Sequence, residues 1–112
     1  MSLATSYAKA LYAAAKEDRT STESMDQLEG HLDAFQGILD SSNDARKALL
    51  GPVVSAKDKG EVIKALGAKA GFSKIFLQFL ILLANKRRLP AFSKIRDAFT
   101  AVRMEAEGGV TG

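Results

Sequence analysis

The stretch at residues 73–88, Ser-Lys-Ile-Phe-Leu-Gln-Phe-Leu-Ile-Leu-Leu-Ala-Asn-Lys-Arg-Arg, decides what kind of fold this chain adopts. Within residues 75–84 only Gln78 is polar. Ser73 can cap a first helical turn, and the closing basic residues suit the negative end of a helix dipole, so we expect a helix from Ser73 to about Lys86. A helix that is apolar on nearly all sides must be covered on nearly all sides, by its own domain or by a partner.

The two faces of this helix differ in composition. One face carries large apolar side chains at helical spacing, and we expect it to point into a core; its members are Phe72, Phe76, Phe79, Leu80 and Leu83. The opposite face is mixed, and its members are Lys74, Gln78, Leu82 and Asn85. The spacing of apolar residues along the chain does not show what covers the apolar part of this outer face, around Leu82.

The beginning of the chain predicts a second helix with two apolar faces. Residues 3–16 are rich in alanine, the best helix former, and Ser2 is available as an N-cap. One stripe on a period of 3.6 residues is formed by Ala4, Ala8, Leu11 and Ala15. The neighbouring stripe is formed by Leu3, Tyr7, Ala10 and Ala14. This helix therefore also needs cover on more than one side.

Between these two segments the sequence predicts two more helices. Residues 22–40 carry an apolar stripe at steps of 3 and 4 within an otherwise polar segment, and Thr20 and Glu23 have the spacing of a capping box. A short helix at residues 44–50 is closed by Gly51 and Pro52. We expect Gly51 to take the left-handed conformation that often ends a helix.

Two further helices complete the prediction. Ser55 can cap one that stops at Gly71, and Pro90 suits the first turn of another that ends near residue 107. Nothing in the sequence alternates as a strand does. We therefore expect an all-α fold, a six-helix bundle formed by one domain at residues 1–107. Residues 108–112 are expected to begin an interdomain linker.

Charge is divided unevenly along the chain. The net charge is +3, but residues 17–44 hold eight acids and one base, whereas residues 45–104 hold thirteen bases and three acids. A basic region can attract nucleic acid or anionic lipid, and here it can equally lie against the acidic segment of its own chain. The net charge does not distinguish between an external anionic partner and a contact within the chain.

The composition leaves little material for catalysis. The chain has no cysteine, and His31 is its single histidine. Gly60 and Gly71 bound a glycine-containing stretch that lacks the lysine and hydroxyl ending of a phosphate-binding loop. We therefore predict no catalytic residue, no metal site and no cofactor, and we expect His31 to be an ordinary boundary residue. The longest apolar run, residues 79–84, is too short to cross a bilayer, so no membrane insertion is expected.

Two interpretations of the remaining surface stay open at this point. The uncovered faces of the first and fifth helices could flank a groove that takes an amphipathic partner helix, or both faces could be internal. As an alternative function, Lys86, Arg87 and Arg88 together with Arg96 and Arg103 could bind RNA or another partner. The absence of an exposed aromatic platform for stacking bases disfavours nucleic acid.

Several stretches resemble the delta subunit of F-type ATP synthases, whose mitochondrial counterpart is the oligomycin-sensitivity-conferring protein. Residues 7–12, Tyr-Ala-Lys-Ala-Leu-Tyr, resemble the Tyr-Ala-Lys-Ala-aromatic signature that opens this family. Residues 51–53, Gly-Pro-Val, are similar to its junction between the third and fourth helices. Residues 79–89 are similar to the end of its fifth helix, Phe-Leu-x-Leu-Leu-x-x-Asn-x-Arg-Leu.

The resemblance implies a non-catalytic component of the peripheral stalk, or stator, of a proton-translocating ATP synthase. A groove between the first and fifth helices would bind the N-terminal helix of an alpha subunit and hold the catalytic alpha/beta head against rotation. Mapped onto this chain, the groove residues are Leu3, Tyr7, Ala10, Ala14, Lys74, Gln78, Leu82 and Asn85.

The same resemblance implies partners and a location. Family members carry a second domain that engages the b subunits of the peripheral stalk, and we expect this chain to be the N-terminal domain without it. The first residues show neither a secretory signal nor a transit peptide. We therefore expect a bacterial protein at the cytoplasmic face of the cell membrane, held there peripherally as part of the complex.

Overall fold

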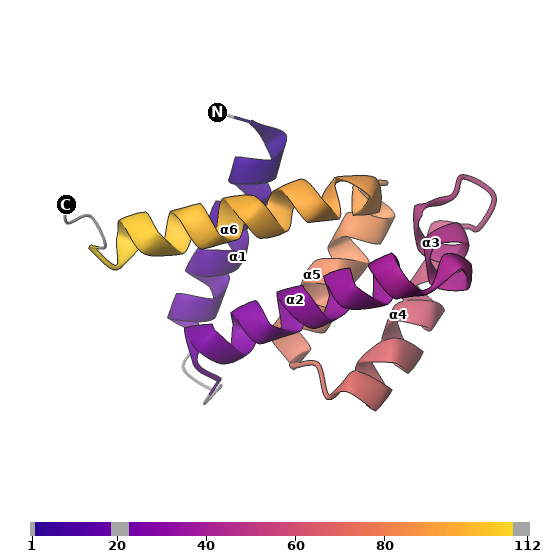
Figure 1. Cartoon of the computed structure of the whole chain (residues 1–112), viewed down its shortest axis with the longest axis horizontal. Coiled ribbons are helices and arrows are strands. Elements are labelled where there is room, and N and C mark those ends of the chain that lie inside the picture. Colours follow the sequence, from indigo (N-terminus) through magenta and orange to yellow (C-terminus); the bar gives the residue numbers. More distant parts are fainter. Residues whose placement is uncertain (1, 19–22, 109–112) are drawn as a thin grey trace.

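A computed structural model describes residues 2–18 and 23–108 of the chain. These residues form six α-helices and one 3₁₀ turn, which confirms the all-α six-helix prediction (Figure 1). The elements are α1 (Leu3–Glu17), α2 (Met25–Ser41), α3 (Asn43–Leu50), α4 (Ala56–Ala70), α5 (Lys74–Asn85), η1 (Leu89–Ala91) and α6 (Phe92–Ala106). Most of the expected linker, residues 109–112, lies outside the described residues, so the domain boundary stays a prediction.

The helices pack in two closely associated pairs with α2 and α3 bridging between them. The most extensive contacts join α1 to α6 and α4 to α5, while α2 packs on both α6 and α3. Figure 1 shows α1 crossing behind α6, with α2 and α6 running side by side. Because α1 and α5 each pack mainly on a different neighbour, they touch each other only slightly.

A cluster of aromatic rings joins three of the helices in the core. Phe35 of α2 lies edge-to-face against Phe92 of α6, with ring centroids 4.8 Å apart, and against Phe76 of α5 at 6.3 Å. These three rings are fully buried. Each contributes about 1.5–3 kcal/mol by leaving water, and edge-to-face pairs add up to about 1.5 kcal/mol. The predicted inward faces of α2, α5 and the last helix therefore meet at one point.

Serine side chains cap the start of the first five α-helices. In each case the hydroxyl oxygen accepts a hydrogen bond from the backbone N–H three residues later, and the caps are Ser2, Ser24, Ser42, Ser55 and Ser73. Each such cap is worth about 1 kcal/mol because it satisfies one of the free N–H groups of the first turn.

The predicted start of α2 is wrong by about one turn. The capping box is formed by Ser24 and Gln27, whose side chains accept from each other's backbone N–H groups at 3.1 and 2.8 Å. Glu23, expected to complete the box, lies before the helix with its carboxylate 2.6 Å from His31. Thr20 lies outside the described residues. The spacing of Thr20 with Glu23 and that of Ser24 with Gln27 both fit a capping box. The sequence could not show that Glu23 pairs with His31 instead, because the spacing of a capping box does not report that contact.

The two glycines expected to end helices behave differently. Gly71 ends α4 with φ +72°, the left-handed conformation that favours glycine, as expected. Gly51 does not, because its φ and ψ are −75° and 158°. A proline disfavours the helical region for the residue before it, so Pro52 holds Gly51 in an extended conformation. A side chain at Gly51 would meet the Lys47 carbonyl oxygen at 2.6 Å.

The end of α5 uses a left-handed residue that is not glycine. Arg87 has φ +59°, and the backbone N–H groups of Arg87 and Arg88 donate to the carbonyls of Ala84 and Leu83 at 3.1 and 2.7 Å. This pair of bonds is a Schellman motif, which normally places glycine at the left-handed position. Pro90 then lies in η1, and α6 begins two residues later than Pro90.

The acidic and basic parts of the chain meet where α2 packs against α6. Arg103 donates to Glu29 at 2.7 Å and also pairs with Asp26 and Glu107, while Arg96 donates to Asp33 at 2.7 Å. The hydrogen bond that Arg103 donates to Glu29, followed by its hydrogen bond to Asp26, raises the pKa of Arg103 above its ordinary value. Part of the charge division is thus internal to the fold.

Replacing Arg103 with methionine should lower the free energy of unfolding by about 1–2 kcal/mol, because Glu29 then loses its charged partner and keeps only the Thr100 hydroxyl, while the apolar stem of residue 103 is kept. Urea unfolding measures the change. The matched control is Arg96→Met, at a more exposed position of the same contact between α2 and α6. This variant should lower the free energy of unfolding by less than about 0.5 kcal/mol. Equal losses for the two variants would contradict a special role for the Arg103 cluster.

Arg87→Gly should raise the free energy of unfolding by about 0.5–1 kcal/mol, because glycine accepts a positive φ without a steric penalty. Arg87→Ala removes the same charge and keeps the strained Cβ, so it should change stability little. Thermal unfolding of both variants makes the comparison. If the glycine and alanine variants melt at the same temperature, strain at Arg87 is negligible.

Candidate groove between helices α1 and α5

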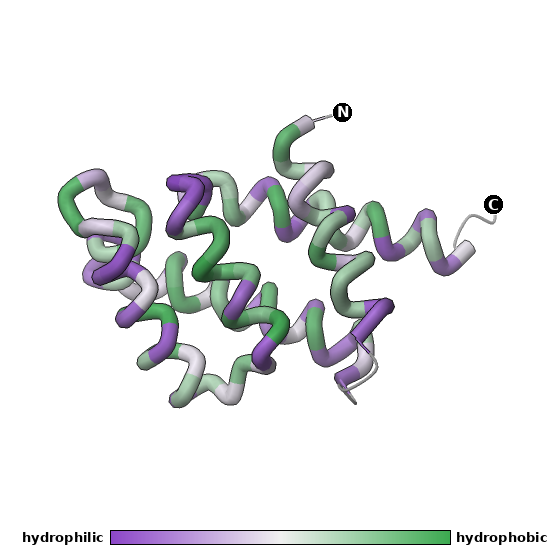
Figure 2. Tube along the Cα trace, turned by 180° about the vertical axis from the view of Figure 1, so that it is seen from behind, coloured by the Kyte–Doolittle hydropathy of each residue, from purple (hydrophilic) through white to green (hydrophobic). Residues whose placement is uncertain are grey.

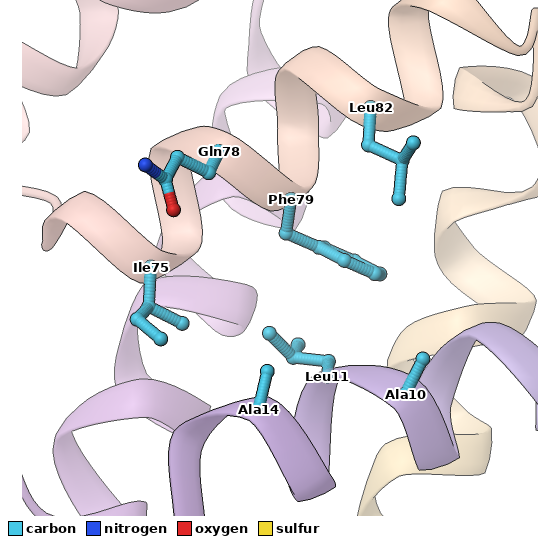
Figure 3. Close-up of a pocket in the computed structure, with 7 residues that line it drawn as sticks. All are labelled: Ala10, Leu11, Ala14, Ile75, Gln78, Phe79 and Leu82. Atoms are coloured by element: carbon cyan, nitrogen blue, oxygen red, sulfur yellow. The ribbon is translucent and has the colours of Figure 1, made fainter. Parts of the chain in front are cut away.

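A hollow of about 250 Å³ lies between α1 and α5. Its α1 wall is formed by Ala10, Leu11 and Ala14, and its α5 wall by Ile75, Gln78, Phe79 and Leu82 (Figure 3). Gln78 is the one polar lining residue among them. The hollow is smaller than the 300–1,000 Å³ typical of small-molecule sites. Its shape and lining therefore suit a few apolar side chains of a macromolecular partner better than a metabolite.

Small side chains on α1 create this hollow. Ala10 and Ala14 are exposed, and in Figure 3 they face α5 across the open space. Leu11 and Phe79 are buried beneath them and close the floor. Leu82, with 41% of its surface exposed, stands on the opposite side. Two alanines on one wall leave room that larger residues would fill, so the groove follows directly from the alanine-rich composition of α1.

The two helices run in opposite directions along the groove. Ala14 lies toward Ile75 at one end, and Ala10 lies toward Leu82 at the other (Figure 3). The N-terminal half of α1 is therefore beside the C-terminal half of α5. The contact of Tyr7 with Phe79 agrees with this arrangement, since the two rings meet at an angle with centroids 6.5 Å apart.

The structure brings together part of the predicted residue set. Ala10, Ala14, Gln78 and Leu82 line the hollow. Tyr7 is half-buried and packs on Phe79, one turn beyond the lining. The other three lining residues are outside the predicted set: sequence reasoning assigned Leu11 and Phe79 wholly to the core and placed Ile75 beside the predicted face of the fifth helix.

The other predicted groove residues lie outside this lining. Lys74 and Asn85 are exposed near the two ends of α5. Leu3 is 46% exposed and lines a separate hollow with Ala91 and Ala98, on the side of α1 that faces α6. Helical periodicity placed Leu3 and Ala10 on one stripe, but α1 packs so extensively on α6 that its first turn is directed to that helix.

His31 and the acidic residues form no metal site in the part of the chain that the structure describes. The His31 ring packs against Phe72 and Phe76, at 5.4 and 5.8 Å between centroids, and its Nε2 lies 2.6 Å from the Glu23 carboxylate. Within residues 2–18 and 23–108, no group of three potential ligands is close enough to hold a metal ion. None of the helices in those residues is long and apolar enough to span a bilayer.

Comparison with known families places the whole described fold in one group. Residues 3–112 match the family described as ATP synthase delta (OSCP) subunit. The subunit delta of Solidesulfovibrio magneticus is 34% identical over 106 residues, covering 95% of this chain and 57% of that protein. The subunit delta of Paramagnetospirillum magneticum is 39% identical over 107 residues, covering 96% and 55%.

One solved structure agrees with the sequence relatives. A chain of the Toxoplasma gondii mitochondrial ATP synthase hexamer superposes with a TM-score of 0.77 at 27% identity, over 88% of this chain and 53% of that one. The present chain thus spans about half the length of the relatives it matches.

Proposed function

Because the chain belongs to the ATP synthase delta (OSCP) subunit family, we propose that it is a non-catalytic component of the peripheral stalk of a proton-translocating F-type ATP synthase. In this role it connects the catalytic alpha/beta head to the stator. The family match over residues 3–112 and the likeness to a chain of an ATP synthase structure support the proposal.

The observation that carries a specific role for this domain is the groove between α1 and α5. Its apolar lining and exposed alanines suit an amphipathic helix, which inserts side chains spaced by three and four residues into such a groove. We assign this place to the N-terminal helix of an alpha subunit. Leu82, a large exposed apolar side chain that the domain itself does not cover, would be buried by this helix.

The size of the groove is compatible with useful affinity. Three or four buried apolar anchors contribute about 1.5–3 kcal/mol each. Association costs several kcal/mol in lost freedom, so a dissociation constant in the micromolar to nanomolar range is reachable. Additional contacts outside the hollow, through Tyr7, Lys74 and Asn85, would extend the interface along both helices.

The mechanism is mechanical. Rotation of a central stalk exerts torque on the alpha/beta ring, and a connector that ties this ring to the stator makes the torque change subunit conformation instead of spinning the head. The compact core and capped helices of this domain suit it to carry force. We assign contact with the b subunits to the second domain that the family resemblance implies, and membrane association to the complex as a whole.

Ala10→Asp should weaken binding of an alpha-subunit N-terminal peptide by about 3 kcal/mol, more than a hundredfold in dissociation constant. The new carboxylate would be buried in an apolar contact without a partner. Isothermal titration with a peptide of about 20 residues, roughly 30 Å of helix, measures the effect. The Solidesulfovibrio magneticus alpha subunit is a suitable source, since that organism supplies one of the relatives.

The matched control for this prediction is Ala13→Asp, which places the same charge on an exposed position of α1 that does not line the hollow. Both variants should keep the circular dichroism and melting behaviour of the parent chain, because both positions are exposed. Equal affinity of the Ala10 variant and the parent would rule out this groove as the binding site.

A further inference from the structure

Three consecutive cations follow α5 without partners in the fold. The side chains of Lys86, Arg87 and Arg88, here named the 86–88 cluster, are exposed, and within the described residues none of them makes a hydrogen bond or an ion pair. The other described arginines behave differently: Arg46 donates to two carbonyls at the end of α2, while Arg96 and Arg103 bind carboxylates. Within the described residues the three charges of this cluster are therefore left unpaired.

The cluster stands at one end of the groove. Gln78, Leu82 and Lys86 are spaced by four residues, so Lys86 continues the stripe of α5 that lines the hollow. The Schellman hydrogen bonds of Arg87 and Arg88 hold the backbone of the cluster in a defined conformation. Figure 2 shows α5 hydrophobic along its middle and hydrophilic at both ends.

The opposite end of the groove has a different charge. There α5 begins with Lys74, and the antiparallel α1 ends with Lys16 and Glu17, followed by Asp18. Among the described residues, two bases and two acids stand at this end, whereas the 86–88 cluster contributes three positive charges at the other. A partner helix that carries carboxylates toward one terminus therefore meets a different potential in its two possible orientations.

We propose that the groove accepts its partner helix in one direction, with the acidic end of that helix against the 86–88 cluster. This inference rests on the proposed function of the groove. The apolar lining provides most of the affinity and does not distinguish the two directions, because its leucine, isoleucine and alanine side chains are uncharged. Charge complementarity at the rim selects the orientation and accelerates association.

The first test reverses the charge of the cluster. Lys86→Glu/Arg88→Glu should raise the dissociation constant of the alpha-subunit N-terminal peptide roughly tenfold at low salt, with the difference shrinking as salt screens the charges. The matched control is Lys57→Glu/Lys69→Glu, which makes the same change in net charge at exposed positions of α4 that do not line the groove. Equal losses in the two double variants would overturn the inference.

The second test reads the direction in the unaltered chain. A nitroxide attached to the end of the peptide that holds more carboxylates should broaden the backbone amide resonances of residues 85–88 and spare those of residues 73–75. Broadening at residues 73–75 would overturn the proposed direction and leave the groove intact as a binding site. Failure of the peptide to bind the unaltered chain would overturn the groove assignment and the direction together.

A fluorescent single-stranded RNA tests the alternative that the 86–88 cluster binds the phosphates of a nucleic acid. Under the proposal it binds weakly, and Lys86→Glu/Arg88→Glu reduces peptide affinity. Tight RNA binding with a steep salt dependence, lost in that variant while peptide affinity is unchanged, would assign the cluster to nucleic acid and overturn the proposal.

Discussion

The burial of α5 is the constraint on which the rest of this structure depends. A helix with a single polar residue between positions 75 and 84 cannot remain in water, and the fold surrounds it with α4, the aromatic cluster of α2 and α6, and Leu11 of α1. Phe76, Leu80 and Leu83 are completely enclosed as a result. Only the stripe around Leu82 escapes, because α1 packs chiefly on α6 and reaches α5 with small side chains.

This incomplete cover links the fold to its proposed function. Leu or Phe at positions 10 and 14 would complete the core and close the hollow, whereas alanine leaves an apolar surface for another helix to cover. A connector between two parts of a rotary enzyme needs a stable body and an adhesive surface, and it needs no catalytic group. The domain has both features in one place, since the floor of the groove is also part of its core.

The charge division has two different physical meanings in the structure. On α2 and α6 the opposite charges satisfy each other, most fully around Arg103, at the surface of a contact whose buried part is formed by Phe35 and Phe92. After α5 the charges of the 86–88 cluster have no counterpart within the described residues. The basic residues in the second half of the chain thus serve two purposes. Some of them bind the acidic residues of α2, and those of the 86–88 cluster are available to a partner.

The sequence by itself determined the helices, the caps at Ser2, Ser55 and Ser73, and the faces that enter the core, because these depend on local spacing and on chemistry within one turn. It also indicated Ala10, Ala14, Gln78 and Leu82 as groove residues. The tertiary structure alone decided that Leu3 turns to α6, that Leu11 and Phe79 floor the groove, and that Ser24 caps α2. Periodicity reports which residues share a face of one helix, whereas the angle and distance at which two helices cross depend on all the side chains between them.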